Sequence, residues 1–528
     1  MAHLTPGYAG PGTGTNTKTE ADFLLQAYTR LRQAINDRAA PSDRGDILPS
    51  SSTITTCLSS LPSPASPSYL SPLGPSPTLT HLLDTVLPAL NRQSLSPRYL
   101  GFVTGGVLPI AEAADNLVSA LDQNVSVHFP SSPSQPWTHS ASTAIEDSAL
   151  RMIISLLHLG EDPSLWPGRI FTTGATASNV LGLACARDAV LAARLPPGTT
   201  VAEVGLLAAC RAAGVTEIQV LTSMAHSSLV KAASVIGLGH RSVKEVGLSR
   251  EEPWRLDLDA VERELEREKD GVVSVIAVSA GEINTGRFAT NVLDMPKLRS
   301  LADRYEAWIH VDGAFGIFAR ALPKTDEFLS LHANAAGLDL ADSITADGHK
   351  LLNVPYDNGI FLCRNAAILS QVFSNPNAAY LASQVDSTGI ISPLNVGIEN
   401  SRRFRALPVY AVLLSEGRDG IAAMLSRMVL LAREIAGFVR DSEHYEWLPR
   451  GDASLESTYI IVLFRAKNPA LNNELVDRIN ATGKMFVSGS RWDGQPAARI
   501  AVASWRVDIE RDAAVIKDVL TSVAEGHS

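Results

Sequence analysis

Lys350 lies at a position in the sequence where its side-chain amine could take part in a reaction. Ser343 to Ala346 has the composition of a short strand, and the Asp347-Gly348 pair that follows it is typical of a turn. Lys350 comes directly after this turn and residues 360–363 favour a second strand, so we expect Lys350 at the tip of a hairpin. A lysine amine in a partly enclosed site loses its proton more readily, because desolvation disfavours the charged form. Such an amine can form a Schiff base with an aldehyde, whereas a lysine on an exposed hairpin would have no chemical role.

A second stretch, Thr172 to Asn179, is a strand end followed by small residues that open a helix. Free amides at a helix start, together with the hydroxyls of Thr176 and Ser178, form an anion site suited to a phosphate. The same composition is also typical of an ordinary helix cap. It does not fit the glycine-rich loops of nucleotide-binding proteins.

Two further strand ends carry side chains that suit a heteroaromatic ring. His226 lies between a predicted strand and a helix and could stack on such a ring, or it could simply be satisfied by the nearby backbone. An apolar strand ends at Asp312, whose carboxylate could keep a ring nitrogen protonated and make the ring an electron sink. Otherwise Asp312 would cap a turn. Tyr380, in a loop after the lysine, could be a packing residue or a mobile proton donor.

The elements that must position these residues alternate along the chain. Strands are predicted at 169–172, 218–222, 272–279, 308–312, 343–346 and 360–363, and helices at 176–194, 227–236, 257–268 and 294–305. This alternation predicts an α/β domain with a mainly parallel sheet. In such sheets ligands bind outside the carboxyl ends of the strands, which is where the candidate residues fall.

The predicted organisation has three parts. Residues 1–96 form an N-terminal helical arm with a flexible Ser/Pro-rich linker at 49–77, and the arm has no core of its own. Residues 97–396 form the large domain, and residues 397–528 form a small α+β domain.

Composition narrows the class of protein. A net charge of −10 with no Lys/Arg-rich block argues against nucleic acid and anionic membranes as partners. The four cysteines have neither metal-ligand nor disulfide-framework spacing, and we predict no metal site. The N-terminus lacks the layout of a signal peptide and no apolar run is long enough to span a membrane, so we expect a cytoplasmic protein.

Taken in order, these stretches resemble the pyridoxal-phosphate-dependent group II amino-acid decarboxylases, such as the aromatic-amino-acid, glutamate and tyrosine decarboxylases. The resemblance runs from about residue 97 to residue 506 and includes the Ser-x-x-x-Asp-x-His-Lys pattern that ends at Lys350. It implies the aspartate-aminotransferase fold (fold type I), pyridoxal 5′-phosphate as cofactor and conversion of an L-amino acid to its amine and CO2. It also implies a homodimer. Further matching motifs are His310-Val-Asp-Gly-Ala-Phe-Gly316, Pro355-Tyr-Asp-Asn-Gly359, Arg402-Arg-Phe-Arg405 and Ala503-Ser-Trp-Arg506.

The resemblance implies a role for each matching residue. Lys350 resembles the Schiff-base lysine, Asp312 the partner of the pyridine nitrogen, and His226 the imidazole stacked on the ring. Ala314 resembles a small residue under the ring, and Tyr380 the loop tyrosine that protonates the substrate carbon. The other positions matched to the phosphate or to the cofactor's surroundings are Ala175, Thr176, Ser343, Asp347, His349, Asn284 and Thr285.

Three positions depart from the family pattern. Gly313 stands where Ala is usual, Leu351 where Trp is common, and Ala177 where an acidic residue is frequent. Aromatic, acidic and small aliphatic amino acids all remain open as substrates. Two alternatives to simple decarboxylation also remain open. One is another pyridoxal-phosphate reaction (oxidative deamination to an aldehyde, transamination or a lyase step), and the other is a catalytically silent cofactor-binding homo-oligomer.

Overall fold

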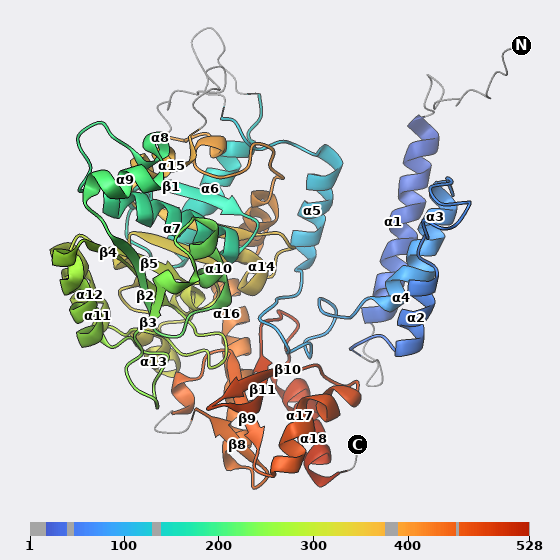
Figure 1. Cartoon of the computed structure of the whole chain (residues 1–528). Helices are drawn as coiled ribbons and strands as arrows, with labels where there is room; N and C mark the ends of the chain where they lie inside the picture. Colours follow the sequence, from blue (N-terminus) through green and yellow to red (C-terminus); the bar gives the residue numbers. More distant parts are fainter. Residues whose placement is uncertain (1–16, 40–46, 129–138, 375–388, 450–453, 527–528) are drawn as a thin grey trace, which may run out of the picture.

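The computed structural model of the protein describes residues 17–39, 47–128, 139–374, 389–449 and 454–526. Within these ranges the chain forms a large α/β part, a smaller part around a second sheet, and a helical arm that stands beside them (Figure 1). No helix of the described residues combines the length and hydrophobicity needed to cross a bilayer.

A seven-stranded sheet forms the centre of the large part, in the order β1-β7-β6-β5-β4-β2-β3. Its strands are β1 (Gly168–Thr172), β2 (Glu217–Thr222), β3 (Val243–Glu245), β4 (Val272–Ser279), β5 (Trp308–Asp312), β6 (Ser343–Asp347) and β7 (Gly359–Cys363). The neighbouring strands β3, β2, β4, β5 and β6 are parallel, whereas β7 pairs antiparallel with both β6 and β1. Because β7 alone is reversed, β1, β2, β4, β5 and β6 all end at the same edge of the sheet.

The helices of this part are α5 (Pro109–Leu121), α6 (Ser142–Leu156), α7 (Ala175–Ala192), α8 (Val201–Val204), α9 (Leu206–Ala213), α10 (Ser227–Val235), α11 (Leu258–Leu265), α12 (Asp294–Arg304), α13 (Leu329–Asn334), α14 (Gly348–Leu351) and α15 (Ala366–Phe373). Helix α7 lies across β4 to β7, and α10 and α15 pack beside it. Helices α11 and α12 contact β4 and β5.

Both faces of the large sheet are buried, and β4 shows how one strand serves both. Val273, Val275 and Ala277 join the apolar cluster that includes α7, whereas Ile276 and Val278 join the cluster on the other face. Successive side chains of a strand point to opposite faces, so a nearly continuous apolar run is what a sheet covered on both sides requires.

The smaller part contains a four-stranded antiparallel sheet in the order β10-β11-β9-β8. Helix α16 enters this part from the large one, and Gly417, with φ 58°, interrupts its helical geometry near the start. The elements are α16 (Ala406–Asp441), β8 (Tyr445–Leu448), β9 (Ile461–Ala466), α17 (Pro469–Ala481), β10 (Ser488–Trp492), β11 (Gln495–Ala501) and α18 (Ile509–Glu525).

The N-terminal arm consists of α1 (Thr17–Ala39), α2 (Ser51–Ser59), α3 (Pro75–His81) and α4 (Leu87–Ala89), and it stands apart from both sheets (Figure 1). None of the residues of α2, α3 or α4 is buried. Apolar side chains of α1 are exposed, with Leu24 at 51% and Leu25 at 69%, so the arm has no apolar core within this chain.

The structure confirms the predicted α/β domain with its mainly parallel sheet, and it corrects several local predictions. The segment 49–77, expected to be flexible, contains α2, whose start is capped because Ser50 accepts the backbone N–H of Thr53. Lys350 follows β6 on the short helix α14 rather than on a simple hairpin turn. Strands β3, β8 and β10 were not predicted. β3 has three residues, and β10 begins Ser-Gly-Ser, a composition with low β propensity.

Candidate active site

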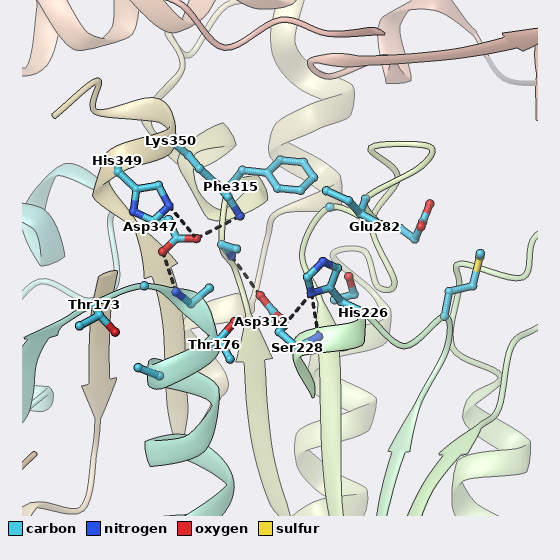
Figure 2. Close-up of a pocket in the computed structure, with 18 residues that line it drawn as sticks. Thr173, Thr176, His226, Ser228, Glu282, Asp312, Phe315, Asp347, His349 and Lys350 are labelled. Carbon is cyan, nitrogen blue, oxygen red and sulfur yellow. Dashed lines mark hydrogen bonds and ion pairs between the residues drawn. The ribbon is translucent and has the colours of Figure 1, made fainter. Parts of the chain in front are cut away.

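A cavity of about 280 Å³ lies at the edge of the large sheet where the parallel strands end. Residues that follow β1, β2, β4, β5 and β6 all line it, as expected for an open α/β sheet. Lys350, Asp312 and His226 face this one cavity from three different elements (Figure 2).

Lys350 enters the cavity from α14, with 16% of its side chain exposed. Its Nζ lies 3.0 Å from Oδ2 of Asp347 and 5.7 Å from the centre of the Phe315 ring. The turn at the end of β6 therefore presents a single amine beside a carboxylate and an aromatic face.

Asp312 occupies the last position of β5, where Thr345 of β6 is its partner in the sheet. Its Oδ2 accepts a hydrogen bond from Nδ2 of Asn179 at 2.8 Å, and its Oδ1 accepts the N–H of Ala314 at 3.3 Å. These two hydrogen bonds fix the orientation of the carboxylate. Ala314 also lines the cavity.

The start of α7 lines the cavity, and its N-cap residue, Gly174, has no side chain that could cap it. Ala175 donates its backbone N–H to Oδ1 of Asp347 at 2.7 Å, so a carboxylate already lies at this helix start. Thr176 lines the cavity, whereas Ser178 faces away from it and bonds Oγ1 of Thr172. The backbone amides of a helix start and the positive end of its dipole suit an anionic group.

His226 caps α10, because its Nδ1 accepts the backbone N–H of Ser228 at 3.2 Å. Burial lowers the pKa of His226, and the nearby carboxylate of Asp312 only partly opposes this effect. The ring is therefore neutral, carries its proton on Nε2, and is held at the cavity wall (Figure 2). His226 therefore meets both expectations: its ring bonds the nearby backbone, and it also lines the cavity.

His349 also lines the cavity, and its Nδ1 lies 2.8 Å from the carbonyl oxygen of Asn358. A carbonyl can only accept, so Nδ1 carries a proton. Burial lowers the pKa of this imidazole as well, although the carboxylate of Asp347 opposes the shift. The ring of Tyr356 lies 4.3 Å from that of His349, centre to centre.

Three of the predicted cofactor residues do not line the cavity. Ser343 is fully buried at the opposite end of β6 from Asp347. Asn284 and Thr285 both donate hydrogen bonds to the carboxylate of Glu282, which does line the cavity. Tyr380 lies outside the described residues.

Sequence reasoning missed Glu282, Phe315 and Ser228 as lining residues. Phe315 belongs to the motif from His310 to Gly316, and Glu282 lies two residues before Asn284. Each comes just after a predicted strand, which was the available signal. Asn179, which bonds Asp312, had no signal beyond its place in the first turns of α7.

Gly359 needs to be glycine, because a Cβ there would lie 2.5 Å from Cα of Gly174 at the start of α7. β7 and the start of α7 are therefore in direct backbone contact.

The residues that line the cavity all fall within a stretch that matches a known protein family. Residues 97–467 match the model described as the pyridoxal-dependent decarboxylase conserved domain. The chain is 28% identical over 330 residues to the L-2,4-diaminobutyrate decarboxylase of Acinetobacter baumannii. That match covers 61% of this chain and 60% of the relative.

Two solved structures share the fold. The Oryza sativa TDC, solved with PLP and tryptamine, superposes with a TM-score of 0.77 at 21% identity, covering 96% of this chain and 98% of that one. The 4-hydroxyphenylacetaldehyde synthase of Rhodiola rosea superposes with a TM-score of 0.74 at 19% identity, covering 98% and 99%.

Proposed function

Because the chain belongs to the pyridoxal-dependent decarboxylase family, we propose that it converts an L-amino acid to its amine and CO2 with pyridoxal 5′-phosphate as cofactor. The observation that carries this proposal is that the Lys350 amine and the Asp312 carboxylate face one cavity, and that a helix start already bonded to a carboxylate lines the same cavity.

The donor groups of the cavity fit this cofactor. The Asp347 carboxylate at the N–H of Ala175 stands in for an anion at the start of α7, where the cofactor phosphate would be held with Thr176. Asp312 would accept a hydrogen bond from the protonated pyridine nitrogen, and His226 would cover the ring. Lys350 provides the amine that an aldehyde requires.

Bound pyridoxal phosphate supplies an aldehyde that bonds to amines and a ring that accepts the electrons left when CO2 departs. The chain's own residues prepare for this chemistry. The bonds from Asn179 and Ala314 hold the carboxylate of Asp312 at the sheet edge, and His226 carries its proton on Nε2, away from its bond with Ser228. Asp347, 3.0 Å from Nζ of Lys350, can hold the ammonium form of that amine.

Tyr380 is proposed as the acid that returns a proton from its hydroxyl to the substrate carbon. Its assignment rests on the matching loop position in the sequence, since this residue lies outside the described ranges. Asn284 and Thr285 are proposed to act through Glu282, whose carboxylate they hold at the cavity wall.

We propose that the protein is a homodimer. Exposed apolar side chains on the arm support this, with Leu25 at 69% and Tyr28 at 49%, as do Leu117 at 50% and Leu121 at 61% on α5. Apolar surface that one chain leaves uncovered on separate helices is typical of an interface between subunits. All four cysteines are free, which supports a reducing compartment, and we propose the cytoplasm.

The test is incubation of the full-length protein with each of the twenty amino acids plus pyridoxal phosphate, with detection of CO2, amine and aldehyde. We expect CO2 and an equal amount of amine from at least one amino acid. Lys350→Ala should abolish both and remove the absorbance of the covalently held cofactor. The matched control Lys297→Ala, which changes an exposed lysine that pairs with Asp259, should change neither.

Other outcomes have distinct meanings. An aldehyde in place of the amine would indicate oxidative deamination. Bound cofactor without turnover of any amino acid would indicate a silent binding protein. Retention of the covalent cofactor absorbance in Lys350→Ala would contradict the site assignment. Tyr380→Phe should lower amine formation, and unchanged amine formation would exclude it as the acid.

A further inference from the structure

Asn179 lies behind the cavity, in the second turn of α7, with its side chain fully buried. Its Nδ2 lies 2.8 Å from Oδ2 of Asp312 and 3.2 Å from Oγ of Ser228. Its Oδ1 lies 2.9 Å from Nε2 of His310. All of its hydrogen-bonding atoms are thus engaged by side chains at the sheet edge or just below it.

A series of hydrogen bonds leads from Trp308 to Asp312, and in each bond the donor lies on the Trp308 side. The indole N–H of Trp308 can only donate, and it lies 2.9 Å from Oγ of Ser343. Ser343 in turn lies 2.8 Å from Nδ1 of His310. Burial lowers the pKa of His310 to about 4, so its ring carries a single proton. An ionised carboxylate can only accept, so Asn179 turns its amide nitrogen toward Asp312 and its oxygen toward His310.

This orientation assigns every remaining proton. Because the oxygen of Asn179 faces Nε2 of His310, that nitrogen carries the imidazole proton and Nδ1 accepts the hydroxyl proton of Ser343. Donation therefore passes from Trp308 to Ser343, to His310, to Asn179 and finally to Asp312. Reversing any one of these hydrogen bonds among the described residues would leave two donors or two acceptors facing each other.

The second N–H of Asn179 leads to His226. It points at Oγ of Ser228, and this hydroxyl lies 2.6 Å from Nδ1 of His226. Since that nitrogen already accepts the backbone N–H of Ser228, the hydroxyl must donate to it as well. One amide thus contributes to the proton placement of both His226 and Asp312.

We propose that Asn179 is a positioning residue that holds Asp312 as an oriented acceptor for the cofactor's pyridine N–H, with His310 fixing the orientation of the amide. This rests on the proposed function of the cavity. Without Asn179, Oδ2 of Asp312 loses its side-chain donor, and its charge is then supported only by the longer bond from Ala314 to the other oxygen.

The test compares two cofactors on full-length protein stripped of its own cofactor. Pyridoxal phosphate and its 1-deaza analogue, in which a C–H replaces the pyridine nitrogen, are each titrated while the quenching of tryptophan fluorescence is followed. The ratio of the two dissociation constants isolates the contact with Asp312, because the analogue offers that carboxylate no N–H. Asp312→Asn provides the reference for complete loss of the preference.

In Asn179→Leu we expect pyridoxal phosphate to bind about tenfold more weakly relative to the analogue, as for loss of one hydrogen bond to a charged group. The control Ser178→Ala breaks a buried bond at the adjacent position of the same helix and should leave the ratio unchanged. His310→Leu should lower the preference, whereas His310→Gln, which can keep an N–H directed at Asn179, should retain most of it.

An unchanged ratio in both Asn179→Leu and His310→Leu would overturn the proposal, because a purely structural role weakens the two cofactors equally. If one variant fails to fold, the other decides. Failure of the unmodified protein to bind either cofactor would instead refute the proposed function. Binding without preference in the unmodified protein would refute the role of Asp312, and the inference with it.

Discussion

Acidification from pH 7 to pH 5 should cost the folded protein about 2 kcal/mol through His310 alone. Burial lowers the pKa of this imidazole from its usual 6.5 to about 4, because the ring is fully enclosed. Below pH 6.5 the unfolded chain takes up a proton on this ring while the folded chain does not. The unfolded state then binds more protons, so the free energy of unfolding falls as the pH falls.

The magnitude follows from the size of the window. Each pKa unit between the two states corresponds to about 1.4 kcal/mol, so the full loss for a pKa lowered from 6.5 to about 4 is about 3.5 kcal/mol. At pH 5 about three fifths of this loss has accrued. Below pH 4 both states carry the proton and the loss from this residue is complete.

The assay is urea unfolding of the cofactor-free protein at pH 7 and pH 5, for the parent chain and for His310→Gln. Other titrating groups are shared by both proteins, so their contributions cancel in the comparison. We expect the parent to lose about 2 kcal/mol more than His310→Gln on acidification. Ser343→Ala removes a neighbouring hydrogen bond but keeps the imidazole, so it should lower stability at both pH values and keep most of the parent's pH dependence.

Equal losses on acidification in the parent and in His310→Gln would refute the reasoning. They would mean that the folded ring titrates near its usual pKa of 6.5, as it does in the unfolded chain. Donation toward Asp312 would then fail on mild acidification, because a doubly protonated ring cannot accept from Ser343.

Three further changes test the packing around the site. Gly182→Ala should destabilise the protein by about 1–3 kcal/mol in thermal or urea unfolding, because the new methyl would lie 2.3 Å from Cε1 of His310. Glu146→Leu should cost about 3 kcal/mol, because the enclosed guanidinium of Arg402 loses its hydrogen-bonded carboxylate and keeps only that of Glu399, 3.8 Å from its Nε; an unchanged urea midpoint would contradict this. Gly359→Ala should push the start of α7 from its place and weaken pyridoxal phosphate binding, measured by fluorescence titration.

Much of the large domain could be predicted because its signals are local. Six of its seven strands are short apolar runs bounded by turn residues, and they form at the expected positions. Lys350 and Asp312 could be identified because each follows such a run directly. The rule that parallel strands present their carboxyl ends at one edge was then enough to bring the two together.

Other features depend on tertiary contacts that no local pattern carries. Ser343 matches the family pattern, yet the strand turns its hydroxyl to Trp308 and His310, far along β6 from the cavity. Asn284 lies two residues after Glu282, which lines the cavity, but its own side chain donates a hydrogen bond to the Glu282 carboxylate and does not line the cavity. In both cases a hydrogen bond to a buried side chain fixes the orientation of the polar side chain.

The contact between α7 and β5 explains why this support for Asp312 can exist at all. His310 and Asp312 are two residues apart on a strand and so point to the same face, toward α7. Asn179 and Gly182 are three residues apart on the helix and so share the face turned to the strand. Only a residue without a side chain at 182 lets the helix approach closely enough for Asn179 to reach both strand residues, since a Cβ there would overlap the His310 ring. The glycine, the asparagine and the His-x-Asp pair therefore form one geometric unit, and replacing any member should disturb the orientation of Asp312.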